Sequence, residues 1–108
     1  EISLPSGQPV TLQEVLYDEQ DSGEVWLRAR FLAPQIGSTY SFEQVADDLP
    51  FLCTEFALPL LAEQGRLVDQ VVISLADRAI EFGTSDPDAT QFFEAYSIEN
   101  GTCIWEAF

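Results

Sequence analysis

The chain has 108 residues, of which 19 are acidic and 4 are basic, so its formal net charge at pH 7 is −15. This balance argues against nucleic-acid binding, because four arginines cannot form the basic patch that neutralises backbone phosphates. The absence of histidine from the sequence excludes Ser-His-Asp and Cys-His catalysis, and two cysteines alone cannot build a tetrahedral zinc site. We therefore expect neither a metal nor a cofactor.

The composition is that of a folded domain despite its charge. Hydrophobic residues make up 46% of the sequence and include 8 Phe, 3 Tyr and 2 Trp, more apolar surface than disordered chains carry. No apolar run approaches the ~20 residues of a membrane-spanning helix, so we expect no insertion into a membrane. Neither a linker nor an internal repeat divides the chain, and we expect one domain over residues 1–108, with residues 1–9 as an extended N-terminal segment.

Apolar and polar residues alternate in residues 10–17 and 24–32, on either side of an acidic loop, and this pattern predicts a β-hairpin. The second strand should turn successive side chains to opposite faces of the sheet. We expect the face toward the core to carry Val25, Leu27, Ala29 and Phe31. We expect the outward face to carry Trp26, Arg28 and Arg30.

The strongest helix signal covers residues 41–64. Ser41 followed by Gln44 is a capping-box pattern, and apolar residues recur at helical spacing after it. Two prolines interrupt this helix, and each removes a backbone hydrogen bond. We expect a kink or a break near Leu49–Pro50 for this reason.

Two further strands are expected after the helix. Residues 67–76 carry apolar side chains on both faces toward their end, which is typical of a central strand covered on two sides. Residues 79–82 can return as its hairpin partner, with Ile73 opposite Phe82. A single helical turn is expected just before Gln91.

Asn100-Gly101 is the preferred pair for a two-residue type I′ turn, so residues 92–99 and 102–108 should form a hairpin with Glu99 opposite Thr102. The face expected under the helix carries Phe92, Tyr96, Ile98, Cys103, Trp105 and Ala107. The other face carries Phe93, Ala95, Ser97, Ile104, Glu106 and Phe108. Together these elements predict an α+β fold: an antiparallel sheet of about six strands in hairpins, with one kinked helix (about 41–64) packed on one face.

The two cysteines fall on elements that should face each other. Cys53 lies on the apolar stripe of the helix, and the hairpin register turns Cys103 toward that helix, which favours a disulfide. The alternative is a pair of buried free thiols. The chain starts at Glu1 and contains no Met, so we expect an N-terminus made by processing, with a cleaved export signal. Both observations favour an extracytoplasmic location, periplasmic or secreted.

The carboxylate clusters are weak candidates for a site. They are Asp47-Asp48, Asp86-Pro87-Asp88, and Asp18-Glu19 with Asp21, and none has the spacing of a calcium-binding loop. A solvated acidic surface is the favoured interpretation. No pair of acids is singled out for glycosidase-type catalysis, so we assign no catalytic residue.

Two surfaces are candidates for contact with a partner. Phe93, Ile104 and Phe108 share a hairpin face and would form an apolar patch rimmed by acids if they are exposed together. Half of the positive charge sits on the stripe of Trp26, Arg28 and Arg30. This stripe can serve as a clamp for an anion, or its arginines can bond to cross-strand acids such as Glu14, the more common arrangement.

Several stretches carry a family resemblance that extends over nearly the whole chain. They are residues 6–16 (SGQPVTLQEVL), 78–83 (RAIEFG), and above all 90–96 (TQFFEAY) and 101–108 (GTCIWEAF). These stretches resemble an uncharacterised family of small exported bacterial proteins, a domain-of-unknown-function family. The resemblance implies export to the periplasm and the two-cysteine pattern. It implies no activity and no site residue.

The favoured function is therefore a non-enzymatic, extracytoplasmic interaction module whose partner is another protein, cationic or mixed in charge. An acidic inhibitor that mimics DNA and occupies a nucleic-acid-binding enzyme is the alternative, because small size and extreme acidity suit it. A carboxylate-based hydrolase is a second alternative.

Overall fold

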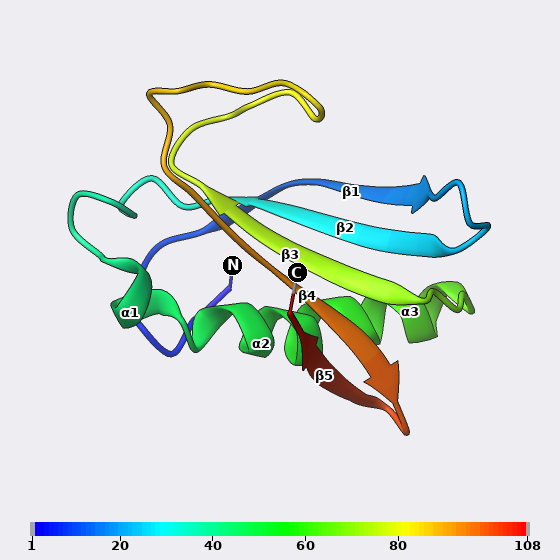
Figure 1. Ribbon diagram of the computed structural model, residues 1–108. Coiled ribbons are helices and arrows are strands. Elements are labelled where there is room, and N and C mark those ends of the chain that lie inside the picture. Colours follow the sequence, from blue (N-terminus) through cyan, green and yellow to red (C-terminus); the bar gives the residue numbers. More distant parts are fainter. Residues whose placement is uncertain (1, 108) are drawn as a thin grey trace.

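The computed structural model describes residues 2–107, and it has an α+β fold (Figure 1). In this part of the chain one five-stranded sheet has the order β1-β2-β3-β4-β5, so the expectation of about six strands was one too many. The strands are β1 (Thr11–Glu19), β2 (Val25–Leu32), β3 (Gln70–Ala76), β4 (Gln91–Glu99) and β5 (Thr102–Glu106). The helical elements on one face are α1 (Phe42–Val45), α2 (Asp48–Leu52), the π-helical η1 (Cys53–Ala57) and α3 (Leu58–Gln64).

The sequence predicted an antiparallel sheet built of hairpins alone, and the structure corrects this. β2 and β3 pair in parallel, with Leu27 opposite Val71, whereas the other neighbouring strands are antiparallel. The helical segment accounts for this difference, because it crosses one face of the sheet and returns the chain to the end from which β2 started. β3 becomes the central strand, and the expectation that both of its faces are covered is confirmed by buried Val71, Val72 and Ile73.

Residues 79–82 do not form the strand expected beside β3. β4 pairs with β3 instead, with Phe93 opposite Ser74, and residues 77–90 leave the sheet as a long loop on the side away from the helices (Figure 1). Instead of backbone pairing with β3, side-chain hydrogen bonds hold this loop. Gln13 and Arg30 both donate to the carbonyl of Ile80. The helical turn expected before Gln91 is only a hydrogen-bonded turn.

The helical segment begins and bends for reasons that the sequence contains. The capping box of Ser41 and Gln44 is present in full at the start of α1. The expected break occurs at residues 46–47, one turn before Pro50, because a proline ring clashes with the carbonyl four residues earlier. Pro59 follows the wide π-helical turn of η1, which leaves room for its ring and its missing N–H.

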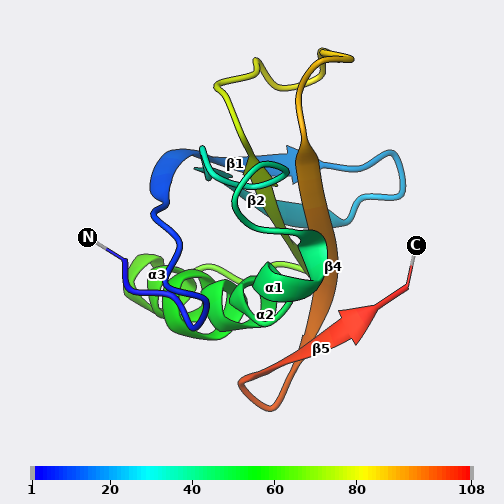
Figure 2. The ribbon, with the colours of Figure 1, turned by 90° about the vertical axis from the view of Figure 1, so that its left-hand side faces the viewer.

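The core lies between the helices and the face of the sheet that they cover (Figure 2). Leu27, Ala29 and Phe31 of β2 are buried there, as the alternation in the sequence predicted. The disulfide is present and joins Cys53 of η1 to Cys103 of β5, with their Cα atoms 6.4 Å apart. It therefore ties the C-terminal hairpin to the helices.

The C-terminal hairpin has the predicted register, with Glu99 opposite Thr102 across a turn in which Asn100 and Gly101 have positive φ. Its exposure differs from the prediction, because Trp105 is 58% exposed instead of lying under the helix, and Ala107 is exposed too. The reason is visible in Figure 2, where β5 leads away from the helices toward its C-terminal end.

The N-terminal arm, residues 2–9, folds back through a turn and is held by one buried acid. The Asp48 carboxylate, at the start of α2, accepts hydrogen bonds from the backbone N–H of Ser6 (3.0 Å), from Ser6 Oγ (2.5 Å) and from Gln8 Nε2 (2.9 Å). Asp48 and Gln8 are almost fully buried, so this is an interior contact. The arm is thus part of the folded body.

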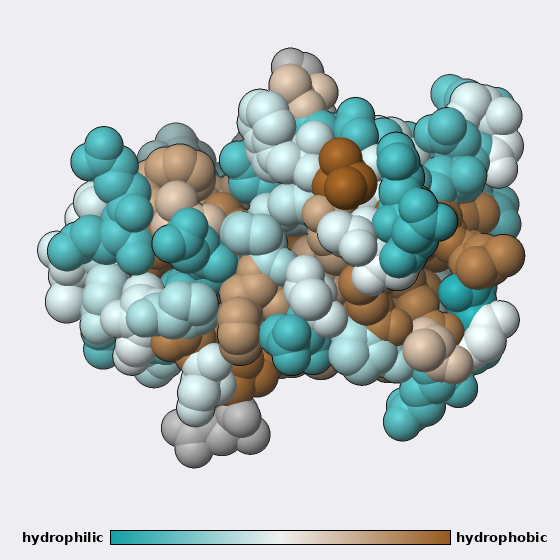
Figure 3. Space-filling model, turned by 90° about the horizontal axis from the view of Figure 1, so that it is seen from below, coloured by the Kyte–Doolittle hydropathy of each residue, from teal (hydrophilic) through white to brown (hydrophobic). Residues whose placement is uncertain are grey.

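The surface on the helix side is mostly hydrophilic, with apolar areas between the polar ones, including a group toward the end that carries α3 (Figure 3). Leu67, just after α3, is almost fully exposed. Within residues 2–107, the helices are too short or too polar to cross a membrane.

Candidate functional site

The outer face of the sheet, opposite the helices, carries a small pocket of about 170 Å³ beneath the loop of residues 77–90. Its floor comes from the three central strands β2, β3 and β4, and the loop forms one wall. We call it the outer-face pocket; its lining residues are Arg28, Arg30, Val72, Ser74, Phe82, Gly83, Thr84, Gln91 and Phe93. It combines cationic, hydroxyl, amide and aromatic groups, and none of the residues from 2 to 107 that line it carries a carboxylate.

The two arginines on the pocket floor are each bonded to an acid on β1. Arg28 Nε lies 2.7 Å from Asp18 Oδ2, and Arg30 pairs through Nη1 with Glu14. Arg30 also donates from Nη2 to the carbonyl of Ile80 at 2.7 Å, so it is buried under the loop. Of the two arrangements considered for this stripe, the structure therefore shows the cross-strand pairs.

Aromatic rings cover the same guanidinium groups. The Cζ atom of Arg28 lies 5.5 Å from the ring centroid of Trp26 and 5.3 Å from that of Phe82, and Arg30 Cζ lies 5.5 Å from the Phe82 ring. These distances fall within the range of cation–π attraction. Among the described residues, no acceptor bonds to the Nη1 and Nη2 groups of Arg28, which remain the donors that a bound group would meet.

The hydrogen bond from Arg28 holds the pKa of Asp18 below its ordinary value of 3.8. A lowered folded-state pKa stabilises the fold at pH values above the unfolded-state pKa, and this stabilisation disappears as the pH falls through the folded-state value. We expect the difference in unfolding free energy between wild type and Asp18→Asn to be constant near neutrality and to shrink below pH 3.8. Urea unfolding of both proteins across the acidic range measures it.

The control for this experiment is Asp21→Asn, at an exposed acid in the loop that follows β1. It removes one surface charge from the same loop region and leaves the pair of Asp18 and Arg28 in place. An Asp18→Asn difference that stayed constant down to the lowest pH would mean that the pair with Arg28 contributes nothing to folding.

The structure describes two of the three apolar residues that the hairpin pattern grouped on one face, Phe93 and Ile104. Phe93 is 54% exposed and lies at the outer-face pocket, beside β3. Ile104 is 38% exposed but pairs with Ser97, closer to the turn, and the Ser97 hydroxyl donates to Glu106 (2.8 Å) between the two positions. Phe108 lies outside the described residues. Phe93 thus lines the same pocket as Arg28 and Arg30 of the arginine stripe.

Sequence reasoning missed Phe82 as a surface residue because it placed residues 79–82 in a strand. In the structure Phe82 is 44% exposed, lies on the loop and lines the same pocket as Phe93. A signal was available, since Gly83 and Pro87 follow this segment closely and favour a loop. The approach of this loop to Arg28 and Arg30 depends on long-range contacts that no local pattern contains.

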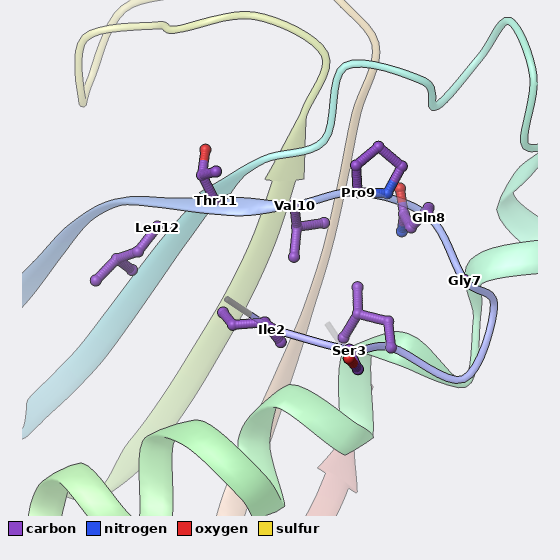
Figure 4. Close-up of a pocket in the computed structure, with 9 residues that line it drawn as sticks. Ile2, Ser3, Gly7, Gln8, Pro9, Val10, Thr11 and Leu12 are labelled. Atoms are coloured by element: carbon purple, nitrogen blue, oxygen red, sulfur yellow. The ribbon is translucent and has the colours of Figure 1, made fainter.

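A larger hollow, of about 620 Å³, lies between the N-terminal arm and the start of β1. Figure 4 shows Val10 directed toward Ile2 across it. Its lining is mainly apolar, and no charged side chain of the described part of the chain contributes to it. The one buried polar atom without a partner among the described residues, Gln8 Oε1, belongs to a side chain that is 2% exposed and so is not presented to a ligand.

The acidic clusters of the sequence do not converge in space. Asp47 is exposed whereas Asp48 is buried against the arm, and Arg78 bonds to Asp77 at 3.1 Å and lies 4.0 Å from Asp86. In residues 2–107 no group of three or more acids or cysteines is arranged to hold a metal ion. The outer-face pocket is therefore the candidate site that the side chains support best.

Comparison with family models matches residues 1–108 to a family of unknown function, DUF6497. No curated protein matches the chain. No solved structure matches it either.

Proposed function

The chain belongs to this family of unknown function, and on that premise we propose from its own geometry that it is an interaction module that binds another protein through the outer-face pocket. The observation that carries the proposal is the meeting of Phe82, Phe93 and Arg28 around one opening on an exposed sheet face. Aromatic and arginine side chains are the residues that most often dominate the binding energy of protein interfaces.

The size of the pocket favours a side chain of a partner over a free small molecule. Sites for drug-sized ligands have volumes of roughly 300–1,000 Å³, and this pocket measures about 170 Å³. We expect one apolar or aromatic side chain of the partner to occupy this pocket beside Phe82 and Phe93, with a polar group at its tip that accepts from the Nη groups of Arg28.

The charge of the chain selects the kind of partner. A net charge of −15 attracts a cationic or mixed surface and repels an acidic one, which raises the association rate at low ionic strength. The partner that fits is therefore a basic protein with an exposed apolar or aromatic residue. An extracytoplasmic setting agrees with the disulfide, because disulfides persist in oxidising compartments.

A carboxylate-based hydrolase gains no support from the titratable groups. Such an enzyme needs one carboxylic acid with a raised pKa to protonate its leaving group. The pKa values of Asp18 and Asp77 are instead lowered, chiefly by hydrogen bonds from Arg28 and Arg78.

The proposal is tested with a displayed library of random peptides. The library is first depleted on the Phe82→Ala variant and then selected on the wild-type protein, and the enriched peptides are titrated calorimetrically. We expect enriched peptides to combine an aromatic or aliphatic anchor with Lys or Arg, and Phe93→Ala to weaken their binding by about tenfold or more. Added salt should weaken it further, in proportion to the basic residues of the peptide.

Leu67→Ala is the matched control, because Leu67 is an exposed apolar residue that lies outside the pocket lining. It should bind each peptide as the wild type does. Enriched peptides that bind equally well to Phe93→Ala would contradict the proposal. If those peptides were purely basic and were displaced by a basic protein that duplex DNA competes for, the DNA-mimic alternative would take its place.

A further inference from the structure

β5 is one of the two edge strands of the sheet, and part of its backbone has no hydrogen-bond partner among residues 2–107. The turn at Asn100-Gly101 makes Glu99 and Thr102 the closing pair, which exchanges both backbone hydrogen bonds. Because hydrogen-bonded and non-bonded pairs alternate in an antiparallel ladder, the backbone groups of Cys103 and Trp105 point away from β4. No described residue bonds to them on that side.

The other edge strand, β1, has features that protect it from pairing with another chain, and β5 lacks them. β1 has a bulge between Leu12 and Glu14, where the Gln13 side chain bonds to Ile80, and such irregularities discourage pairing with another chain. The register of β5 is regular throughout. Its Trp105 side chain is exposed on one face and its Ile104 side chain on the other. A regular edge strand with an unpaired backbone and exposed apolar side chains on both faces is suited to the addition of another strand.

The charge around β5 decides what can add to it. Residues 91–106 form β4, the turn and β5; they contain Glu94, Glu99 and Glu106 and no basic residue. A second copy of β5 would place acids beside acids in a protein whose net charge is already −15, so self-pairing is opposed by repulsion. An extended segment with Lys or Arg at alternate positions would meet opposite charges instead.

We propose that β5 accepts an extended basic segment of a partner protein as an added strand. Main-chain hydrogen bonds to Cys103 and Trp105 provide the affinity, and the glutamates of the hairpin select basic side chains. This site lies beyond the outer-face pocket: Ile104 and Trp105 are absent from the pocket lining, and the strand carries its own recognition chemistry.

The test uses a synthetic peptide in which arginine and valine alternate, with a glutamate–valine peptide as its acidic counterpart. Binding is followed by NMR amide exchange in the wild-type protein. We expect the arginine peptide to slow exchange at Cys103 and Trp105 by about tenfold or more, while Ile104, whose N–H already faces β4, changes little. Equal binding of the glutamate peptide, or protection that is absent at Cys103 and Trp105, would overturn the proposal.

Two variants separate the backbone from the side chain. Trp105→Ala and Trp105→Pro both remove the indole, but only the proline variant also removes the outward-facing N–H. An edge strand tolerates proline at such a position because that N–H is not paired within the sheet. Trp105→Pro should bind the arginine peptide about tenfold more weakly than Trp105→Ala, and an intact disulfide by mass together with unchanged circular dichroism establishes that it is folded. Equal affinities would contradict the proposal. Phe82→Ala should leave this binding unchanged, so failure here and failure of the pocket are distinguishable.

Discussion

Replacing Cys53 and Cys103 together by alanine is expected to lower the free energy of unfolding by about 4 kcal/mol, the value that the chain-entropy model assigns to a loop of this length. The bond joins residues 50 positions apart and is the covalent link between the helices and the C-terminal hairpin. Without it, the unfolded chain gains conformational freedom, and the hairpin keeps only its ladder to β3 and its packing on the core. This is a large part of the stability of about 5–15 kcal/mol that is typical of a domain.

Denaturant unfolding of the double variant and of the wild type, the latter with and without reductant, measures this effect. Reduced wild type should approach the double variant, which makes it the matched control for the loss of side-chain volume. Native-state amide exchange should become faster in β4 and β5 than in β1 and β2, because the hairpin is the element released. A loss of stability below about 1 kcal/mol would show that the tie contributes little.

Replacing Asp48 by alanine is the second change with a large expected effect. It removes the acceptor of three hydrogen bonds and leaves the donors of Ser6 and Gln8 without their partner in a buried place. Hydrogen bonds to a charged group contribute about 1.5–3 kcal/mol each, but release of the arm to water limits the total, so we expect a loss of about 2–4 kcal/mol. Urea unfolding gives the value, and limited proteolysis within residues 2–9 reports the release.

Asp47→Ala is the control, since Asp47 is the adjacent acid, is exposed and makes no capping hydrogen bond. It should change the stability by less than about 0.5 kcal/mol and leave the arm resistant to protease. If both variants lost the same stability, general charge and not the contact with the arm would explain the effect of Asp48.

The disulfide was within reach of sequence reasoning because two independent local patterns pointed to it. Helical spacing placed Cys53 on the apolar stripe, and the Asn100-Gly101 turn determined which face of the hairpin Cys103 occupies. The sequence also suggested Glu14 as an example of a cross-strand acid for the arginines, and in the structure it lies opposite Arg30. Local periodicity suffices where an element and its neighbour are joined by a short turn.

Only part of the candidate site could be predicted from the sequence. The stripe of Arg28 and Arg30 and the exposure of Phe93 follow from strand alternation, but their meeting with Phe82 does not. Residues 79–82 are apolar enough to form a strand, and the loop signal of Gly83 and Pro87 just after them does not show that β4 takes their place beside β3. β4 takes that position instead because it offers a longer apolar strand, and the displaced loop is then held by Gln13 and Arg30.

By itself, the sequence determined the α+β class, the first and the last hairpin, the capped and interrupted helical segment, and the strongly negative net charge. Those properties depend on residue type and on contacts close along the chain. Only the tertiary structure decided that β2 and β3 run parallel, that the loop of residues 77–90 covers the arginines, and that β5 is left as an open border. In each case segments that are distant along the chain could occupy the same place beside a strand. Which one does so depends on the total buried area and hydrogen bonding of the fold, and no local sequence pattern contains these.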